Sequence, residues 1–280
     1  MSQSQSRMSR WINWSADEPA TWTLPAFQGL RKFWPARELL MDAWMTWLGW
    51  YFSEGSLGYF HGEPYTVNVT NSDPQILAEL MALTRVLGWA PHLYEQTNAY
   101  TVRIGSRQLA AWLALWGRGA CEKYLPPFVR HASARHLRLF LEAYVRGDGY
   151  MKSSERRIIY TSSVRMAGDL QECILKAGGI SVVRPRKLAG KPAVFASHTG
   201  TSRHDGYVVS WQDGRSAILF RKQHLEEIPY KGYVYCAEVP PHHLLFTRRH
   251  GYAMWSGNSA IDDIIWETAE GAMTTSSALW

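Results

Sequence analysis

The chain has 280 residues, of which 46% are hydrophobic and 19% are charged, the balance of a globular protein with one large domain or two smaller ones. A formal net charge of +6 and a pI near 9.2 permit an anionic partner without requiring one. The three cysteines, Cys121, Cys173 and Cys236, are far apart and form no CxxC pair. This spacing argues against a structural zinc site and against a disulfide framework.

The first ten residues, MSQSQSRMSR, are polar and lack the apolar core of a signal peptide. No apolar run approaches the roughly 20 residues that a membrane-spanning helix needs. We therefore expect a cytoplasmic protein, in a bacterial or phage-infected cell.

Two predicted helices end in the same unusual way, with an acidic residue followed by glycine. The first lies in LGWYFSEGS (48–56) and the second in LEAYVRGDGY (141–150). Glu54 and Asp148 would face the negative end of a helix dipole, which disfavours a carboxylate. We expect Gly55 and Gly149 to take the left-handed conformation that commonly ends a helix. Tryptophans at helical spacing in the same regions predict core positions: Trp44, Trp47, Trp50, Trp112 and Trp116.

The segments that follow the two motifs resemble each other. Residues 66–88 and 157–179 each read as a strand, a polar N-cap cluster and an amphipathic helix. Residues 70–72 (TNS) align with 161–163 (TSS), and Gly88 aligns with Gly179. Further strands are predicted over 99–106 and 206–212. The pattern indicates one supersecondary unit used twice, although two ordinary strand–helix units would also give it.

Small residues recur four positions apart within each motif, at Gly49 and Ser53 in one and at Ala143 and Gly147 in the other. Small side chains at this spacing allow two helix backbones to approach closely. The two helices are therefore predicted to pack side by side, which would bring the carboxylates at their C-terminal ends together. Two adjacent carboxylates repel unless a cation lies between them, and Mg²⁺ prefers such hard oxygen ligands.

With these features, LGWYFSEGS and LEAYVRGDG resemble the two copies of the LAGLIDADG motif of homing endonucleases, over about residues 39–222. The stretch KYLPPFVRHASARHLRLFLEAYV (123–145) is also similar to that family's approach to its second motif. The resemblance implies an α+β fold, a two-repeat pseudo-dimer of αββαββα-like repeats over 38–122 and 123–225. It also implies that Glu54 and Asp148 bind the divalent metal ions that cut double-stranded DNA.

In that family the strands of both halves straddle DNA. The resemblance therefore implies that basic residues in predicted strands contact phosphates or bases, although each alone is an ordinary surface charge. The candidates are Arg103, Arg156, Arg157, Arg184, Arg186 and Lys187. Lys222 and Lys231 are candidates for a basic residue that assists the metal ions.

The tail does not continue this pattern. Residues 233–239, 244–249 and 252–255 read as three short strands, with turns at PPHH and RHG. They lead to Asn258-Ser259, and an asparagine amide can attack its own carbonyl to cleave the chain while a serine hydroxyl can accept an acyl group.

VYCAEVPPHHLLF followed by WSGNS resembles the C-terminal splicing blocks of an intein, a setting in which these endonucleases often occur. The resemblance implies that Asn258 cyclises, that Ser259 begins the C-terminal extein and that His243 transfers protons. Cys236 stands at a position where some inteins carry an internal nucleophile, although a buried structural cysteine is the alternative. Gly257 replaces the usual penultimate histidine.

Nothing in residues 1–47 resembles the first block of an intein. We therefore expect residues 1–37 to be an intein-derived connector, 38–225 an endonuclease domain, 226–258 a partial all-β splicing region and 259–280 a host fragment. An N-terminal intein fragment would then act in trans. Two alternatives are a trans-splicing fragment with a vestigial endonuclease and a DNA-binding protein that has lost cleavage.

Overall fold

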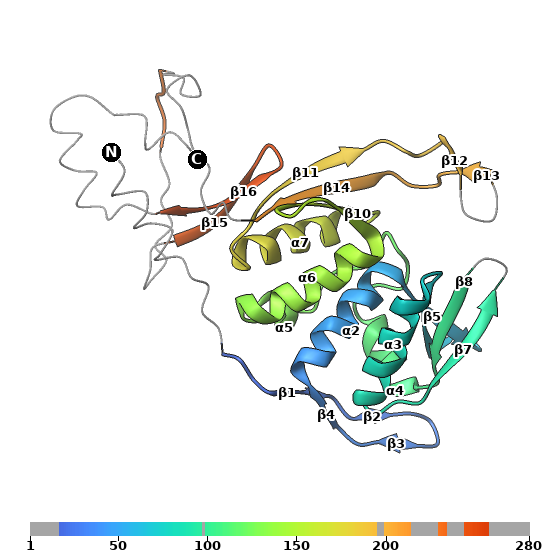
Figure 1. The fold of residues 1–280 in the computed structure, drawn as a ribbon. Helices are drawn as coiled ribbons and strands as arrows, with labels where there is room; N and C mark the ends of the chain where they lie inside the picture. Colours follow the sequence, from blue (N-terminus) through green and yellow to red (C-terminus); the bar gives the residue numbers. More distant parts are fainter. Residues whose placement is uncertain (1–16, 97–98, 195–198, 214–228, 234–243, 258–280) are drawn as a thin grey trace. The chain divides into compact units, whose positions relative to one another are not determined.

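The computed structural model describes residues 17–96, 99–194, 199–213, 229–233 and 244–257. The chain divides into two compact units, one ending at Ser216 and the other beginning at Ala217. The first unit holds every helix of the described residues and the strands β1 to β14, and the second holds the hairpin of β15 (Leu244–Arg249) and β16 (Tyr252–Gly257) (Figure 1).

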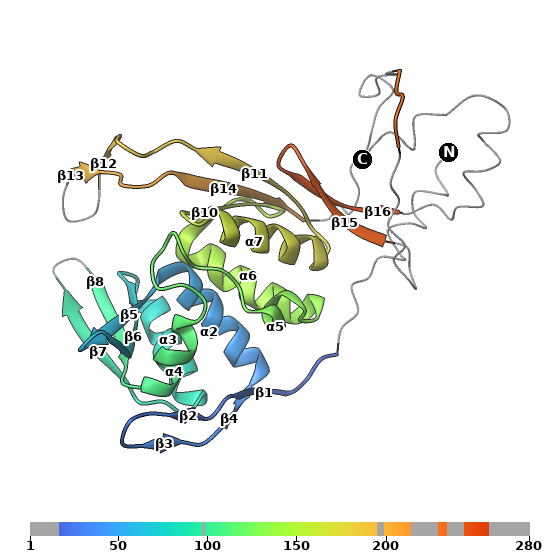
Figure 2. The same cartoon turned by 180° about the vertical axis from the view of Figure 1, so that it is seen from behind.

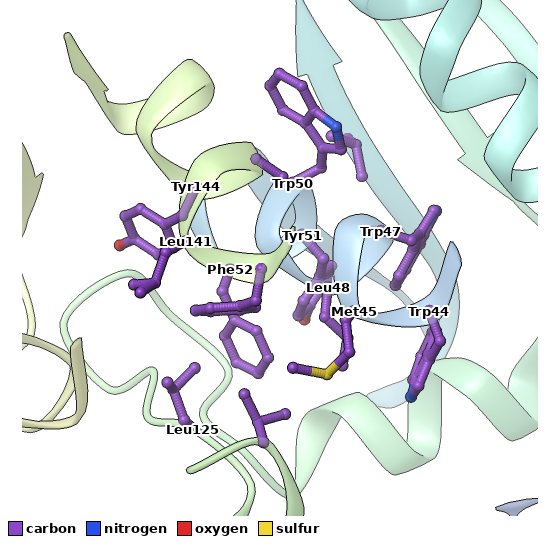
Figure 3. Close-up of a cluster of buried hydrophobic side chains, with 14 of the residues drawn as sticks. Trp44, Met45, Trp47, Leu48, Trp50, Tyr51, Phe52, Leu125, Leu141 and Tyr144 are labelled. Carbon is purple, nitrogen blue, oxygen red and sulfur yellow. The ribbon is translucent and has the colours of Figure 1, made fainter. Parts of the chain in front are cut away.

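Two neighbouring helices, α2 (Met41–Glu54) and α6 (Ala134–Asp148), form the centre of the first unit (Figure 2). Nine of the fourteen residues of α2 are buried, because the helix is apolar on nearly all sides and is covered by other elements. The aromatic and aliphatic side chains of α2 meet those of α6 in one continuous core (Figure 3). The tryptophans predicted as core are buried or partly buried within it.

The two central helices run in the same direction. At their N-terminal ends, Asp42 Oδ1 lies 3.0 Å from Nε2 of the fully buried His136. Near their C-terminal ends, Gly147 lies against Ser53. Matched contacts at both ends confirm that the predicted small residues let the helices pack closely with their C-terminal ends together.

Each central helix leads into a strand–strand–helix–strand–strand repeat, and the two repeats form the two halves of the first unit. After α2 come β5 (Gly55–Phe60), β6 (Glu63–Asn71), α3 (Pro74–Val86), β7 (Pro91–Gln96), β8 (Ala99–Ile104) and then α4 (Arg107–Ala114). After α5 (Pro127–Arg130) and α6 come β9 (Gly149–Ser153), β10 (Arg156–Thr161), α7 (Val164–Lys176), β11 (Ile180–Arg186) and β14 (Gly206–Gln212). Within the repeats the strand orders are β5-β6-β8-β7 and β9-β10-β14-β11, so the two repeats have the same topology. Between β11 and β14, β12 (Pro192–Val194) pairs with β13 (Thr199–Thr201).

The structure shifts the predicted alignment of the two repeats by one residue. Asn71 and Thr161 each end the second strand, and each side chain accepts a hydrogen bond from the backbone N–H two residues later, at 2.9 and 3.2 Å. Gly88 and Gly178 each follow the next helix with φ of 80° and 84°. Gly88 therefore corresponds to Gly178, and the predicted match with Gly179 is wrong.

The prediction of left-handed glycines at the ends of α2 and α6 is also wrong. Gly55 and Gly149 are extended, with φ of −80° and −155°, because the chain passes from each helix directly into a strand. Glycine is needed there for space instead. A Cβ on Gly55 would lie 2.8 Å from Tyr51 Cα, and one on Gly149 would lie 2.9 Å from Val145 O.

The segment predicted to be a connector also packs on the core. It contains β2 (Phe27–Gln28), which pairs with β3 (Phe33–Trp34), and β1 (Thr21–Leu24). β1 pairs with β4 (Arg37–Leu40), which lies at the start of the predicted endonuclease domain. The Trp22 ring stacks on Phe128 and Trp44, with centroids 4.6 and 5.6 Å apart. This segment therefore forms part of the first unit's core.

The second unit contains the predicted tail hairpin. The strand predicted over 244–249 is β15, and the one predicted over 252–255 is β16, which extends to Gly257. His250 and Gly251 connect them with φ of 50° and 82°, the two positive values typical of a tight hairpin turn. The strand predicted over 233–239, apart from its first residue, and the PPHH turn lie outside the described residues. No helix in the described part of the chain is long and apolar enough to cross a membrane.

Candidate active site

Glu54 and Asp148 are the last residues of α2 and α6, as predicted. The close packing of the helices brings the two residues together at one end of the interface. A Cβ on Gly147, the neighbour of Asp148, would lie only 3.1 Å from Glu54 Cγ. The two central helices therefore place one carboxylate from each half of the unit at a shared site.

Both carboxylates are in an environment that disfavours their charge. Burial raises the pKa of Glu54 above its usual range, and the charge of Lys123 opposes this effect in part. The pKa of Asp148 is raised to about 7, mainly by burial and next by the nearby charge of Glu54, while the charge of Lys123 acts in the opposite direction. Near neutral pH a cation would therefore relieve a real electrostatic cost at this site.

Lys123 is a buried basic residue beside both carboxylates, and it was not among the residues predicted from the sequence. Its side chain is almost fully buried, and Nζ donates hydrogen bonds to the carbonyl oxygens of Tyr51, Phe52 and Gly55 at 3.0, 3.2 and 2.8 Å. An ammonium group has three donors, so these carbonyls use all of them. The pKa of Lys123 is lowered to about 8, because the effect of burial exceeds the opposing effect of the charges of Asp148 and Glu54.

The backbone around Lys123 is held by α7 of the second half. Ser163, the N-cap of α7, donates its hydroxyl to Lys123 O at 2.6 Å, and Leu125 N–H donates to Asp169 Oδ2 at 2.7 Å. Lys123 thus connects the C-terminal end of α2 to the segment before α6. The sequence around Lys123, KYLPP, does not reveal this role. The groups that Lys123 contacts are backbone carbonyls about 70 residues earlier in the chain, and no residue pattern marks them.

A cavity of about 180 Å³ opens beside Asp148. Its lining combines charged and hydroxyl-bearing side chains from α2, α6, β10, β11 and the segment before α5, including Ser53, Lys123, Tyr144, Asp148, Tyr160 and Arg186. Asp148 therefore borders a space large enough for water or for a small anionic group.

The residues at this site fit a divalent cation that is also bound by groups outside the protein. The described residues contain no cluster of three or more His, Cys, Asp or Glu side chains suited to hold a metal ion. Glu54 and Asp148 supply two hard oxygen donors with raised pKa values. Mg²⁺ often binds to one or two carboxylates and completes its shell with water and substrate phosphates.

The two sheets each carry one face that the helices do not cover. In the second half, strand register places Arg156, Tyr160, Arg184 and Arg186 on the same open face. In the first half, the corresponding face carries polar groups, and Arg103 Nε donates to Asn68 Oδ1 at 2.9 Å. Lys187 follows β11 and is exposed.

Arg157 does not belong to this face, contrary to the prediction. Alternation along β10 directs it to the helix-covered side, where it is 8% exposed and lies over the Trp211 ring at 4.3 Å. Its guanidinium forms an ion pair with Asp213 at 2.5 Å and approaches Glu142 at 3.7 Å. Arg157 therefore stabilises the second half from within.

The residues predicted for splicing, Cys236, His243, Asn258 and Ser259, lie outside the described residues, as does Lys222. Lys231 is described, as an exposed residue of the second unit. Ser256 precedes Gly257 in β16, and its hydroxyl lies 2.7 Å from Thr247 Oγ1 across the hairpin.

No family model matches the chain. Similar curated proteins include an RNA polymerase subunit beta C-terminal section of Stigeoclonium helveticum (23% identity; 80% of this chain, 24% of that protein). Another is an ATP-dependent Clp protease proteolytic subunit of Chlamydomonas moewusii (25%; 59% and 17%). A third is the RNA polymerase subunit Rpo1C of Methanocaldococcus jannaschii (29%; 41% and 13%). The chain thus spans a quarter or less of these proteins.

Similar solved structures include I-DmoI in complex with DNA and Ca, with 15% identity and a TM-score of 0.44. That match covers 61% of this chain and 83% of I-DmoI. The homing endonuclease I-WcaI, bound to its DNA recognition sequence, matches with 8% identity and a TM-score of 0.39, over 61% of this chain and 76% of I-WcaI. This chain is therefore similar to homing endonucleases at low identity.

Proposed function

We propose that the chain is a two-repeat endonuclease of the LAGLIDADG type, which hydrolyses both strands of double-stranded DNA with Mg²⁺. The observation that carries this proposal is the pair of partly buried carboxylates, Glu54 and Asp148, at the joined ends of two parallel helices. One carboxylate from each repeat suits a substrate that presents two equivalent phosphodiesters, one on each strand.

The chain's own residues hold and tune the site. Glu54 and Asp148 would hold divalent cations, which when bound would polarise a phosphate oxygen and activate a water molecule. Water oxygen then bonds to phosphorus, the bond from phosphorus to one bridging sugar oxygen breaks, and that oxygen leaves with a proton. Lys123 acts as a positioning residue, because its three donors fix the last turn of α2 and its charge favours ionised carboxylates.

The open sheet faces are the proposed DNA interface. Exposed Arg156, Arg184, Arg186 and Lys187 would contact phosphates or bases from the second half, and Arg103 from the first. Phosphate contacts of this kind make binding strongly salt-dependent. Arg157 is excluded from this interface because its charge is already paired within the fold.

We further propose that the second unit belongs to the C-terminal splicing region of an intein. The support is that the chain resembles parts of functionally unrelated proteins, a polymerase subunit and a protease subunit, and covers a small share of each. An inserted element is found in unrelated hosts in this way. Cys236, His243, Asn258 and Ser259 are the proposed splicing residues, with an N-terminal intein fragment as a partner in trans.

The test of the endonuclease is cleavage of a randomised duplex DNA library by the purified chain with Mg²⁺, followed by sequencing of the cut ends. We expect one recurrent site, cut on both strands. Glu54→Gln and Asp148→Asn each keep the side-chain shape and remove the charge, so each should abolish cutting while the variants still bind the recovered site. A wild-type chain that binds the library DNA without cutting any of it would favour a DNA-binding protein instead.

A further inference from the structure

The two halves of the proposed active site are not equivalent. The cavity beside Asp148 is lined by Lys123 and Arg186, and Glu54 is not among its lining residues. Because the sheets share one strand order, each residue near Asp148 can be compared with the residue in the same place near Glu54.

Arg186 is the last residue of β11 and pairs with Gly206, the first residue of β14. Its guanidinium lies 5.7 Å from the centroid of the Tyr160 ring, and Tyr160 in turn stacks on Tyr150 with centroids 6.3 Å apart. Among the described residues, no carboxylate forms an ion pair with Arg186. The stacked rings hold a charged guanidinium at the wall of the cavity, available to an anion.

Gln96 occupies the same place in the first half. It is the last residue of β7 and pairs with Ala99, the first residue of β8. Its Nε2 donates to Thr101 Oγ1 at 2.8 Å, and that hydroxyl lies 2.8 Å from Thr70 Oγ1. The half that contains Glu54 therefore has a neutral, internally hydrogen-bonded group where the other half has a cation.

We propose that Arg186 contacts the scissile phosphate of the strand cut beside Asp148, and that this strand is cut first. The inference rests on the proposed endonuclease function and assigns an unequal task to its two halves. A guanidinium gains hydrogen-bond strength as negative charge grows on a phosphate oxygen during attack. The strand beside Glu54 lacks that contact, so a nicked duplex should accumulate before the double-strand break.

The experiment uses the site recovered from the library, as a duplex with a different fluorophore on each strand. Single-turnover cleavage with Mg²⁺ is followed on denaturing gels for the wild type, Arg186→Gln and Arg184→Gln. Arg184 is the matched control, because it is an exposed arginine on the same strand and face that does not line the cavity. DNA binding is measured in EDTA, and melting temperatures verify that the variants fold.

We expect the wild type to cut one strand faster. Arg186→Gln should slow that strand by about 100-fold, as loss of one donor to a developing oxyanion does, and change the other strand by less than about threefold. Arg186→Lys should recover part of the rate, and Arg184→Gln should weaken binding and slow both strands alike. Gln96→Arg supplies the missing cation and should speed the slower strand.

Equal loss on both strands in Arg186→Gln would overturn the inference, as would a loss explained by weaker DNA binding, or no loss. In each of these cases the wild type still cuts, so the proposed function stands. A wild type that cuts neither strand of any library member would instead remove the proposed function, and the inference with it.

Discussion

Gly147 of α6 lies so close to Ser53 of α2 that a Cβ on Gly147 would be 2.8 Å from Ser53 Cβ, well inside normal contact. The Ser53 hydroxyl is already committed to its own helix, where it lies 3.0 Å from Gly49 O and 3.1 Å from Trp50 O. Gly49 is equally constrained, since its Cβ would be 2.7 Å from Ala143 Cβ. The proximity of Glu54 and Asp148 therefore depends on four small residues at the helix interface.

Substitution of Gly147 should separate the helices at the site. We expect Gly147→Ala to lower the free energy of unfolding by about 1–3 kcal/mol and Gly147→Leu by more, because both overpack the interface. Denaturant unfolding measures the change. Gly119→Ala is the matched control, because nothing lies within 4 Å of the added Cβ. An unfolding free energy for Gly147→Leu equal to that of the wild type would contradict the close helix contact.

The Asp148→Asn variant should be more stable than the wild type at pH 8 without divalent cations. The folded-state pKa of Asp148, about 7, is above its unfolded value, so the folded state holds the proton more tightly. The contribution of Asp148 to stability is therefore most favourable below about pH 4 and is lost as pH rises to about 7, at a cost of at most about 4 kcal/mol.

Thermal unfolding in EDTA at pH 4 and pH 8 tests this expectation. The two proteins should differ at pH 8 and converge near pH 4. Mg²⁺ at pH 8 should then raise the melting temperature of the wild type more than that of Asp148→Asn, because binding to the folded state stabilises it. Equal melting temperatures at pH 8 would show that Asp148 carries no electrostatic cost.

Lys123→Met should affect both stability and the pH dependence of cleavage. It leaves three backbone carbonyls without their donor and two carboxylates without their compensating charge, at a cost of about 3–5 kcal/mol. Loss of the positive charge should also raise the pKa of Asp148, since Lys123 lowers it. The acid limb of the cleavage rate should then move up by about one pH unit or more.

The pH profile separates a positioning role from a purely structural one. Lys123→Arg keeps the charge, so we expect its acid limb to stay near that of the wild type even if its stability falls. A Lys123→Met variant that unfolds more easily but keeps the wild-type pH profile would limit Lys123 to a structural role.

The proposed splice junction makes a separate prediction. Cyclisation of Asn258 needs its amide nitrogen held against its own carbonyl, a proximity effect. Because Gly257 replaces the usual histidine, Asn258 lacks its usual assisting group, and we expect the purified chain to stay full length. A matching N-terminal intein fragment should complete the splicing domain that holds Asn258 in place, so we expect its addition to release residues 259–280. Mass spectrometry detects the released peptide. Release that is unchanged by Asn258→Ala would remove Asn258 from the mechanism.

Local patterns in the sequence were sufficient for the main helices, several of the strands and the carboxylate pair. The 3.6-residue spacing of apolar side chains places α2, α3, α6 and α7, and the small residues four apart predict the α2–α6 contact. The proximity of Glu54 and Asp148 follows from these two predictions, because each residue ends one of the two helices and the helices pack with their C-terminal ends together. The tail hairpin follows from its Arg-His-Gly turn.

Tertiary structure alone decided the features that depend on groups distant in the sequence. Lys123 is recognisable only when the carbonyls of Tyr51, Phe52 and Gly55 surround it, and Arg157 is internal only because β10 presents it to Asp213. Gly55 and Gly149 are required by neighbouring atoms rather than by their own dihedral angles. Sequence periodicity reports which face a residue shares, whereas burial and charge pairing arise only when separate elements meet.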